Sequence, residues 1–236
     1  MMICEMITDQ PLIPPNAFLD AYAHGAFPMA DRADSNRLYW LSPEPRCVVP
    51  LDGIHLPRRL RKTVRNAGFE VTVDKAFGQV LERCAGGNED RPESWINPPI
   101  RAGFTALHDL GHAHSVEVWR DGQLAGGLYG LAIRGVFFGE SMFAAERDAS
   151  KVAFVHMIAL LRAGGYRLLD SQMLTPHLAQ FGAVEIRKAE FLRRLGEALR
   201  HQAAFGEGDV GRELEGLIGP KDPAAQGAAS HPEDRA

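Results

Sequence analysis

Apolar positions recur with two different periods in the middle of the chain, about residues 56–203, and this distinguishes helices from strands. Leu56, Leu60 and Val64 repeat at helical spacing, whereas residues 69–73 read FEVTV, which is typical of a strand. Further helices are predicted at 76–84, 98–110, 148–161, 176–181 and 188–202, and further strands at 114–119, 123–133, 136–143, 166–170 and 183–186. Asp121-Gly122 and Arg134-Gly135 predict the two turns of a three-stranded meander.

Proline and glycine set apart the regions on either side. Residues 1–55 contain a helix expected at 16–24 and short segments interrupted by proline, which lacks a backbone N–H and disfavours long elements. From residue 204 the chain is rich in Gly, Pro, Ala and acidic residues with little periodicity, as in disordered segments. We therefore expect a small N-terminal subdomain over residues 1–60, a main domain over 61–203 and a disordered tail over 204–236.

The order of the predicted elements indicates a fold class. Three antiparallel strands, a long helix and a further strand follow one another between residues 114 and 170. This is the order of an acyltransferase-type α/β fold, so the chain is expected to be α+β, with an acetyltransferase-like (GNAT-type) C-terminal domain. A fold alone does not establish an activity, so function must be argued from particular residues.

Composition indicates the cellular compartment of the protein and the kinds of partner that it can bind. The 236-residue chain has no run near the roughly 18 apolar residues of a membrane span. Its N-terminus carries Glu5 and Asp9 in place of a basic segment, which argues against a secretory signal. The odd set of Cys4, Cys47 and Cys84 suits a reducing compartment, so we expect a cytoplasmic protein that does not bind membranes. The net charge of −4 argues against nucleic-acid binding through overall charge and leaves room for a local basic patch.

Asp170 and Gln172 form the first candidate for chemistry, at the end of an apolar strand. Residues i and i+2 of a strand share a face about 6.5 Å apart. An Asp170 carboxylate that accepts from the Gln172 side-chain amide would turn the amide oxygen outward as a fixed acceptor for an amine. The alternative is a polar pair solvated at a strand end.

Glu140 is the second candidate, because it lies in the aromatic run FFGESMF, residues 137–143. A carboxylate buried in such a run is unfavourable unless it is paired or used. Gly139 predicts a β-bulge, which would allow Phe137, Glu140 and Met142 to line one pocket. The alternative is an edge-strand carboxylate that faces water.

A basic helix is predicted over residues 56–65, LPRRLRKTVR. Its apolar positions occupy one face, and Arg58, Arg61, Lys62 and Arg65 fall on the other, as in a helix that contacts phosphates. A merely solvated face is the alternative. Trp95, after an acidic glycine-containing loop, could stack on a nucleic-acid base or fill a core.

His108, His112 and His114 have the spacing H-x3-H-x-H, which is not a strong zinc pattern. A glycine at 111 separates the first from the last, so packing and hydrogen bonding explain them better than metal binding. No metal site is therefore predicted.

Several segments, taken together and in order, resemble the leucyl/phenylalanyl-tRNA–protein transferase family over about residues 16–195. They are AYAHGAFP, YWLSPEPR, FEVTVDKAFGQVLERCA, TALHDLGHAHSVEVW, LAGGLYGLAIRGVFFGESMF, DASKVAF and LLDSQMLTPHLAQFGAVEI. The resemblance implies a bacterial cytoplasmic enzyme that needs no metal or other cofactor. Such an enzyme moves Leu or Phe, with Met as a further donor, from aminoacyl-tRNA onto proteins that begin with Arg or Lys, and so creates a degradation signal.

The resemblance also assigns roles to residues of this chain. The family's catalytic Asp–Gln pair matches Asp170 and Gln172, its motif carboxylate matches Glu140, and its adenosine-stacking Trp matches Trp95. The pocket for the transferred side chain matches five apolar residues: Leu128, Phe137, Met142, Met157 and Leu169. Met29 stands where the family often has a second Trp, directly after Phe-Pro.

The chemistry implied by the resemblance agrees with these residue types. An aminoacyl ester is already activated, so no covalent enzyme intermediate is required. A Gln oxygen could orient the attacking amine and stabilise the charge that develops on it. An acyl-CoA acetyltransferase would carry a glycine-rich loop where this chain reads AAERDASK, and a non-catalytic tRNA-binding module would have no reason to keep Asp170 and Gln172 in register.

Overall fold

A large sheet of seven strands forms the centre of the molecule in the computed structural model, which describes residues 2–6, 13–86 and 94–219. The strand order is β10 (Val184–Ile186), β4 (Arg46–Val49), β9 (Leu168–Gln172), β8 (Val136–Ala144), β7 (Gln123–Ile133), β6 (Ala113–Arg120) and β5 (Glu70–Val73). Strands β8 and β9 are parallel, and the other neighbours are antiparallel. The mixed α/β architecture expected from the sequence is confirmed.

The meander β6–β7–β8 follows the predicted alternation closely. Asp121 and Gly122, at the first turn, have φ of 50° and 74°, and Arg134 at the second has φ of 51°. Positive φ at such positions is what two-residue hairpin loops require. Strand β9 begins and ends two residues later than predicted, so Asp170 lies within the strand and Gln172 is its last residue.

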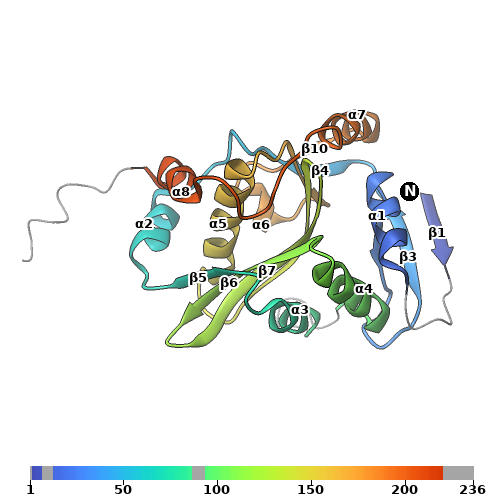
Figure 1. Ribbon diagram of the computed structural model, residues 1–236, viewed down its shortest axis with the longest axis horizontal. Coiled ribbons are helices and arrows are strands. Elements are labelled where there is room, and N and C mark those ends of the chain that lie inside the picture. The colour runs from blue at the N-terminus through green and yellow to red at the C-terminus, as the bar shows by residue number, and fades with distance from the viewer. Residues whose placement is uncertain (1, 7–12, 87–93, 220–236) are drawn as a thin grey trace, which may run out of the picture.

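Helices cover both faces of this sheet (Figure 1). On one face lie α2 (Arg58–Asn66), α5 (Ala149–Ala163) and α8 (Val210–Ile218), and on the other α3 (Phe77–Ala85) and α4 (Pro98–Asp109). Two hydrophobic clusters fill these layers: one surrounds α5, and the other joins α3 and α4 to α1 (Pro15–Ala23) and α7 (Lys188–Ala198). The remaining helix, α6 (Pro176–Ala179), follows β9. No helix of the described residues is long and apolar enough to cross a membrane.

A second, smaller sheet lies beside α1 in the order β1 (Met2–Met6), β3 (Leu38–Ser42) and β2 (Phe27–Met29) (Figure 1). It corresponds to the short segments expected in the N-terminal region. Strand β4 also comes from that region, yet it pairs with β9 and β10 inside the large sheet. The N-terminal part therefore supplies a strand next to the candidate residues of β9.

The region after residue 204 differs from the disordered tail that its composition predicts. Residues 210–218 form α8, which packs on α5 and α2. Val210, Leu214 and Leu217 give it an apolar face toward the α5 cluster, and the Asp209 side chain caps its N-terminus by accepting from the Arg212 backbone N–H. The prediction of disorder rested on the composition of residues 204–236 as a whole, which does not reflect the short amphipathic pattern of residues 210–218. Residues 220–236 lie outside the described part of the chain.

Candidate active site

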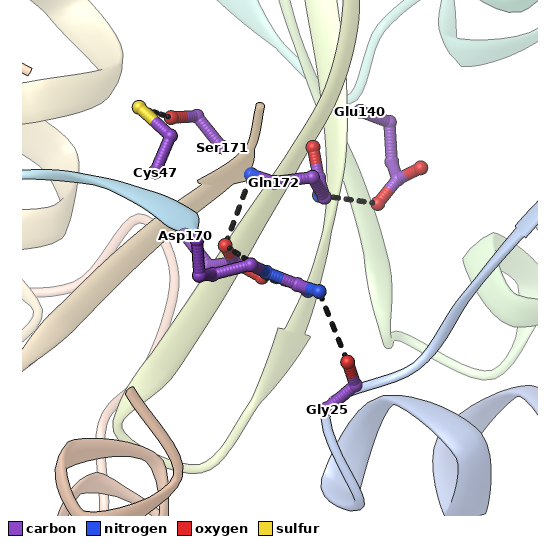
Figure 2. A network of polar contacts seen from close by, with 7 residues as sticks. Gly25, Cys47, Glu140, Asp170, Ser171 and Gln172 are labelled. Atoms are coloured by element: carbon purple, nitrogen blue, oxygen red, sulfur yellow. Dashed lines mark hydrogen bonds and ion pairs between the residues drawn. The ribbon is translucent and has the colours of Figure 1, made fainter. Parts of the chain in front are cut away.

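Polar side chains from three adjacent strands, β4, β9 and β8, meet on one side of the large sheet (Figure 2). Asp170 and Gln172 come from β9, Glu140 from β8 and Arg46 from β4. The structure thus brings together the three catalytic candidates predicted from the sequence and adds an arginine that the sequence did not single out. The partners of each side chain differ from those expected, however.

The Asp170 carboxylate is completely buried and is held by a two-pronged contact with Arg46. Arg46 Nε donates to Oδ1 at 2.8 Å, and Nη2 donates to Oδ2 at 2.6 Å. Oδ1 also accepts from the Gln172 backbone N–H at 3.0 Å. Charged, bidentate hydrogen bonds of this kind are the stronger and more directional ones, so the carboxylate is fixed in place.

The predicted side-chain hydrogen bond from Gln172 to Asp170 is wrong. Gln172 has φ of 57°, in the left-handed region, which ends the alternation of β9 and turns its side chain away. Its side-chain Nε2 donates instead to Glu140 Oε1 at 3.3 Å (Figure 2). Asp170 therefore accepts a hydrogen bond from the Gln172 backbone N–H, and the Gln172 side-chain amide donates one to Glu140.

Glu140 occupies the β-bulge that Gly139 predicted. In the pairing of β7 with β8, Tyr129 is opposite Ser141 and Gly130 is opposite Gly139, so Glu140 is left without a partner in the strand register. Phe137 and Met142 pack in the cluster around α5, whereas Glu140 interacts with residues on the other side of the sheet. The expectation that these three side chains share one apolar pocket is therefore not met.

The surroundings of Glu140 change its acidity. Burial raises the pKa of its carboxyl to about 8; the Asp170 charge acts in the same direction, and the Tyr22 side chain and the Arg46 charge act against it. Burial and the Glu140 charge in turn raise the pKa of Tyr22, on α1, well above its ordinary value, so this phenol stays neutral. Glu140 is consequently poised to gain or lose a proton near neutral pH.

Cys47 lies beside the site on the opposite face of β4. Ser171 Oγ donates to its Sγ at 3.2 Å, and burial raises the pKa of the thiol (Figure 2). Since the thiolate is the nucleophilic form, Cys47 is a poor nucleophile in this state.

The five predicted pocket residues do come together. Leu128 is paired with Met142 across β7 and β8, Phe137 is paired with Leu169 across β8 and β9, and Met157 reaches the same cluster from α5. Met142 is half-buried and the other four are buried. Trp95 belongs to the other cluster, where it is half-buried and its carbonyl accepts from the Ala30 backbone N–H, next to Met29.

The predicted basic patch is divided between solvent and protein. Arg58, Arg61 and Lys62 are exposed on α2. Arg65 instead donates through Nη2 to the carbonyl oxygens of Ile218 and Gly219, at 3.0 and 2.6 Å. A cation at the carboxyl end of a helix stabilises that end, so Arg65 holds α8 in place.

Two of the three histidines in the H-x3-H-x-H segment, His108 and His114, have local partners. His108 Nδ1 contacts the Ala113 carbonyl oxygen at 2.8 Å, and its ring stacks on Phe77. His114 Nδ1 contacts Asp74 Oδ2 at 2.7 Å. Among the described residues, no group of three or more His, Cys, Asp or Glu side chains is arranged to hold a metal ion.

Sequence reasoning missed Arg46 and Tyr22. Arg46 is 124 positions from Asp170, and Tyr22 is 118 positions from Glu140 (140 − 22), so no local spacing connects them. The one available signal was an arginine at the start of the apolar run RCVV, where a buried strand would need a partner for its charge.

Comparison with known proteins supports the same interpretation. Residues 48–196 match the model of the leucyl/phenylalanyl-tRNA protein transferase family, and residues 14–44 match the model of that family's N-terminal domain. Curated proteins named leucyl/phenylalanyl-tRNA–protein transferase are 54% identical over 187 residues in Paramagnetospirillum magneticum (79% of this chain, 90% of that protein) and 46% identical over 226 residues in Rhizorhabdus wittichii (94% and 91%).

Among solved structures, the C-terminal domain of a putative lysylphosphatidylglycerol synthetase from Agrobacterium fabrum matches with 14% identity and a TM-score of 0.36, over 80% of this chain and 58% of that one. That likeness is too weak to carry an argument about fold. The sequence matches are decisive: the chain belongs to the leucyl/phenylalanyl-tRNA–protein transferase family, aminoacyltransferases that move an amino acid from tRNA onto a protein.

Proposed function

We propose that this enzyme transfers Leu or Phe, with Met as a further donor, to the α-amine of cytoplasmic proteins that begin with Arg or Lys, and so marks them for degradation. The observation that carries the mechanism is the contact between the Gln172 amide and the Glu140 carboxyl. In this contact the Glu140 carboxyl, which can accept a proton, is held in position by the Gln172 amide at the end of β9.

The reaction requires a proton to leave the attacking nitrogen. The α-amine attacks the ester carbonyl carbon, the new C–N bond forms, and the bond to the tRNA 3′ oxygen breaks. In our proposal one N–H proton passes to the Glu140 carboxylate, and Glu140 then protonates the departing oxygen. Its pKa of about 8 matches that of a protonated α-amine, about 7.7–8.0, so that a proton passes readily between the attacking nitrogen and Glu140.

Gln172 suits both protonation states of Glu140. Its amide nitrogen donates to the carboxylate, and a rotated amide would present its oxygen to the protonated acid. Asp170 contributes by holding the Gln172 backbone in its left-handed conformation through the 3.0 Å contact. Much of the rate would then come from positioning.

The substrate contacts follow from where the other candidates lie. The apolar cluster of Leu128, Phe137, Met142, Met157 and Leu169 is proposed to receive the Leu or Phe side chain. Met142 is half-buried and two residues from Glu140, so in our proposal the substrate passes beside it between the cluster and the proton acceptor. Trp95 is proposed to stack on the terminal adenosine. The exposed Arg58, Arg61 and Lys62 are proposed to contact acceptor-stem phosphates, with Arg65 supporting that surface from within.

For the fold, we propose that the main domain is GNAT-like. The support is the β6–β7–β8 meander, followed by α5 and by β9, which runs parallel to β8. In our proposal the small sheet and α1 form the core of the N-terminal subdomain. Ala30, just after β2, donates its backbone N–H to the carbonyl oxygen of Trp95.

The test is a transfer assay with the purified chain. Labelled Leu-tRNA or Phe-tRNA is mixed with a protein that begins with Arg, and the site of labelling is found by mass spectrometry. We expect label on the N-terminal α-amine, none on the same protein after N-acetylation, and little with Val-tRNA, because branching at Cβ stiffens χ1. Label on lysine side chains, or equal use of Val-tRNA, would contradict the proposal.

A further inference from the structure

Arg46 is the largest completely buried side chain among the described residues. A buried guanidinium is unfavourable unless every part of it is compensated. Here all three nitrogens have partners: Nε and Nη2 bind the Asp170 carboxylate, and Nη1 donates to the Gly25 carbonyl oxygen at 3.0 Å. The aromatic rings of Phe27 and Phe191 lie 5.0 and 4.5 Å from its central carbon.

These contacts come from parts of the chain that are distant in sequence. Gly25 and Phe27 belong to the turn after α1 and to β2, in the N-terminal region, whereas Asp170 lies on β9 and Phe191 on α7. Gly25 itself has φ of 81°, and a Cβ there would approach Leu192 Cδ2 to 2.9 Å, so the turn is held close to α7. Arg46 thus fixes the catalytic strand relative to the N-terminal region.

One oxygen connects Arg46 to the reacting groups. Asp170 Oδ1 accepts from both Arg46 Nε and the Gln172 backbone N–H, at 2.8 and 3.0 Å. Gln172 in turn donates to Glu140. The place of Oδ1 therefore sets the left-handed turn at Gln172, and that turn aims the amide at Glu140.

We propose that Arg46 is a positioning residue for the transfer reaction: through Asp170 it holds the Gln172 amide against Glu140. This inference rests on the proposed function. It requires the rigid planar fork of arginine and not merely a positive charge, because a lysine ammonium cannot bind both carboxylate oxygens and the Gly25 carbonyl in one plane.

The experiment compares Arg46→Lys with Arg32→Lys, since Arg32 forms a similar two-pronged contact with Asp34 on the surface. We expect Arg46→Lys to lower kcat about 10- to 100-fold, as a misplacement near 1 Å would, while KM for Leu-tRNA changes less than about twofold. Arg32→Lys should retain wild-type kcat.

A readout independent of transfer separates positioning from general damage. Hydrogen exchange of the Gln172 backbone N–H, followed by NMR, should accelerate at least about tenfold in Arg46→Lys, while the Phe138 amide in the adjacent β8 keeps its wild-type rate. Equal acceleration of both amides, or unchanged kcat in a folded Arg46→Lys, would overturn the proposal.

Should Arg46→Lys not fold, the double variant Arg46→Met with Asp170→Leu replaces the buried ion pair by apolar groups, an exchange that buried pairs often tolerate. It should fold and show a kcat at least about 100-fold below that of the wild type, with fast exchange at Gln172. A folded, active double variant would refute the role of Arg46. If the wild type itself transfers no Leu, the proposed function fails, whereas the exchange results still test the positioning.

Discussion

Two arginine–aspartate contacts in this molecule have nearly the same geometry and very different surroundings. Arg46 and Asp170 meet through Nε and Nη2 at 2.8 and 2.6 Å, with exposed side-chain fractions of 1% and 0%. Arg32 and Asp34 meet through the same atoms at 2.8 and 2.7 Å, with exposed fractions of 66% and 71%. Any difference in what the two pairs do must therefore come from their environment.

The surface pair is exposed to water and joins two residues that are close in sequence. Its hydrogen bonds lower the pKa of Asp34, but exposed ion pairs of this kind contribute little to folding. The buried pair joins residues 124 positions apart and leaves an uncompensated charge in the core if one partner is removed. It also lies one hydrogen bond from Gln172, so its removal affects chemistry as well as stability.

The largest difference between the two pairs should follow removal of the aspartates. Asp170→Ala leaves Arg46 buried without its partner and is expected to lower the free energy of unfolding by about 3–5 kcal/mol and to abolish measurable transfer. Asp34→Ala should leave both unchanged within error. Urea titration and the transfer assay measure these quantities; similar behaviour of the two variants would remove the distinction.

Glu140→Gln should separate activity from stability. We expect transfer to fall about 10²- to 10⁴-fold, the usual range for removal of a group that moves protons. The folded-state pKa of about 8 is raised, so the stability linked to this carboxyl is fully present below about pH 4.5 and is lost as pH rises through 8.

At pH 9 the free energy of unfolding of the variant should therefore exceed that of the wild type by a few kcal/mol, and urea titration should show this as a higher midpoint. At pH 4.5 the two proteins should be nearly equal in stability. A wild-type protein whose stability relative to Glu140→Gln does not change between these pH values would contradict the raised pKa.

Gln172→Ala tests the step between the buried pair and Glu140. It keeps the Arg46–Asp170 contact and the Gln172 backbone N–H but removes the amide that reaches Glu140. We expect a fall in kcat of roughly 10-fold or more with tRNA binding nearly unchanged. Ser171→Ala, which removes only the hydrogen bond to Cys47, serves as the control and should keep nearly full activity.

The smallest effects are expected on α2, where charges are exposed. Replacing Arg58 and Lys62 with Ala should weaken the binding of all tRNAs about equally. It should also reduce the slope of log affinity against log salt by roughly one unit for each phosphate that is no longer bound. Arg200→Ala, exposed just beyond α7, is the control. A normal salt titration for the double variant would show that α2 is only a solvated surface.

Much of the fold was accessible from the sequence because it rests on local signals. Alternation and turn residues predict β6, β7 and β8, and a glycine correctly marked the bulge at Glu140. The short α8 was missed because its few apolar positions are diluted by a tail of Gly, Pro and Ala.

The candidate site was accessible only in part. Asp170, Gln172 and Glu140 could be chosen as polar residues in apolar strands, but their mutual contacts could not, since strand alternation assumes an extended backbone and Gln172 has φ of 57°. The role of Arg46 depends on the pairing of β4 with β9, which the sequence did not predict. Tertiary pairing, and not local pattern, creates the chain of contacts from Arg46 to Glu140.

The central claim is that Glu140 is the proton acceptor, and its ionisation tests this most directly. The protein can be labelled with ¹³C at glutamate side-chain carboxyls and the Glu140 signal assigned by its absence in Glu140→Gln. The account predicts that this carboxyl titrates near pH 8 in the folded enzyme. A titration near the ordinary glutamate value of about 4.3 would contradict it.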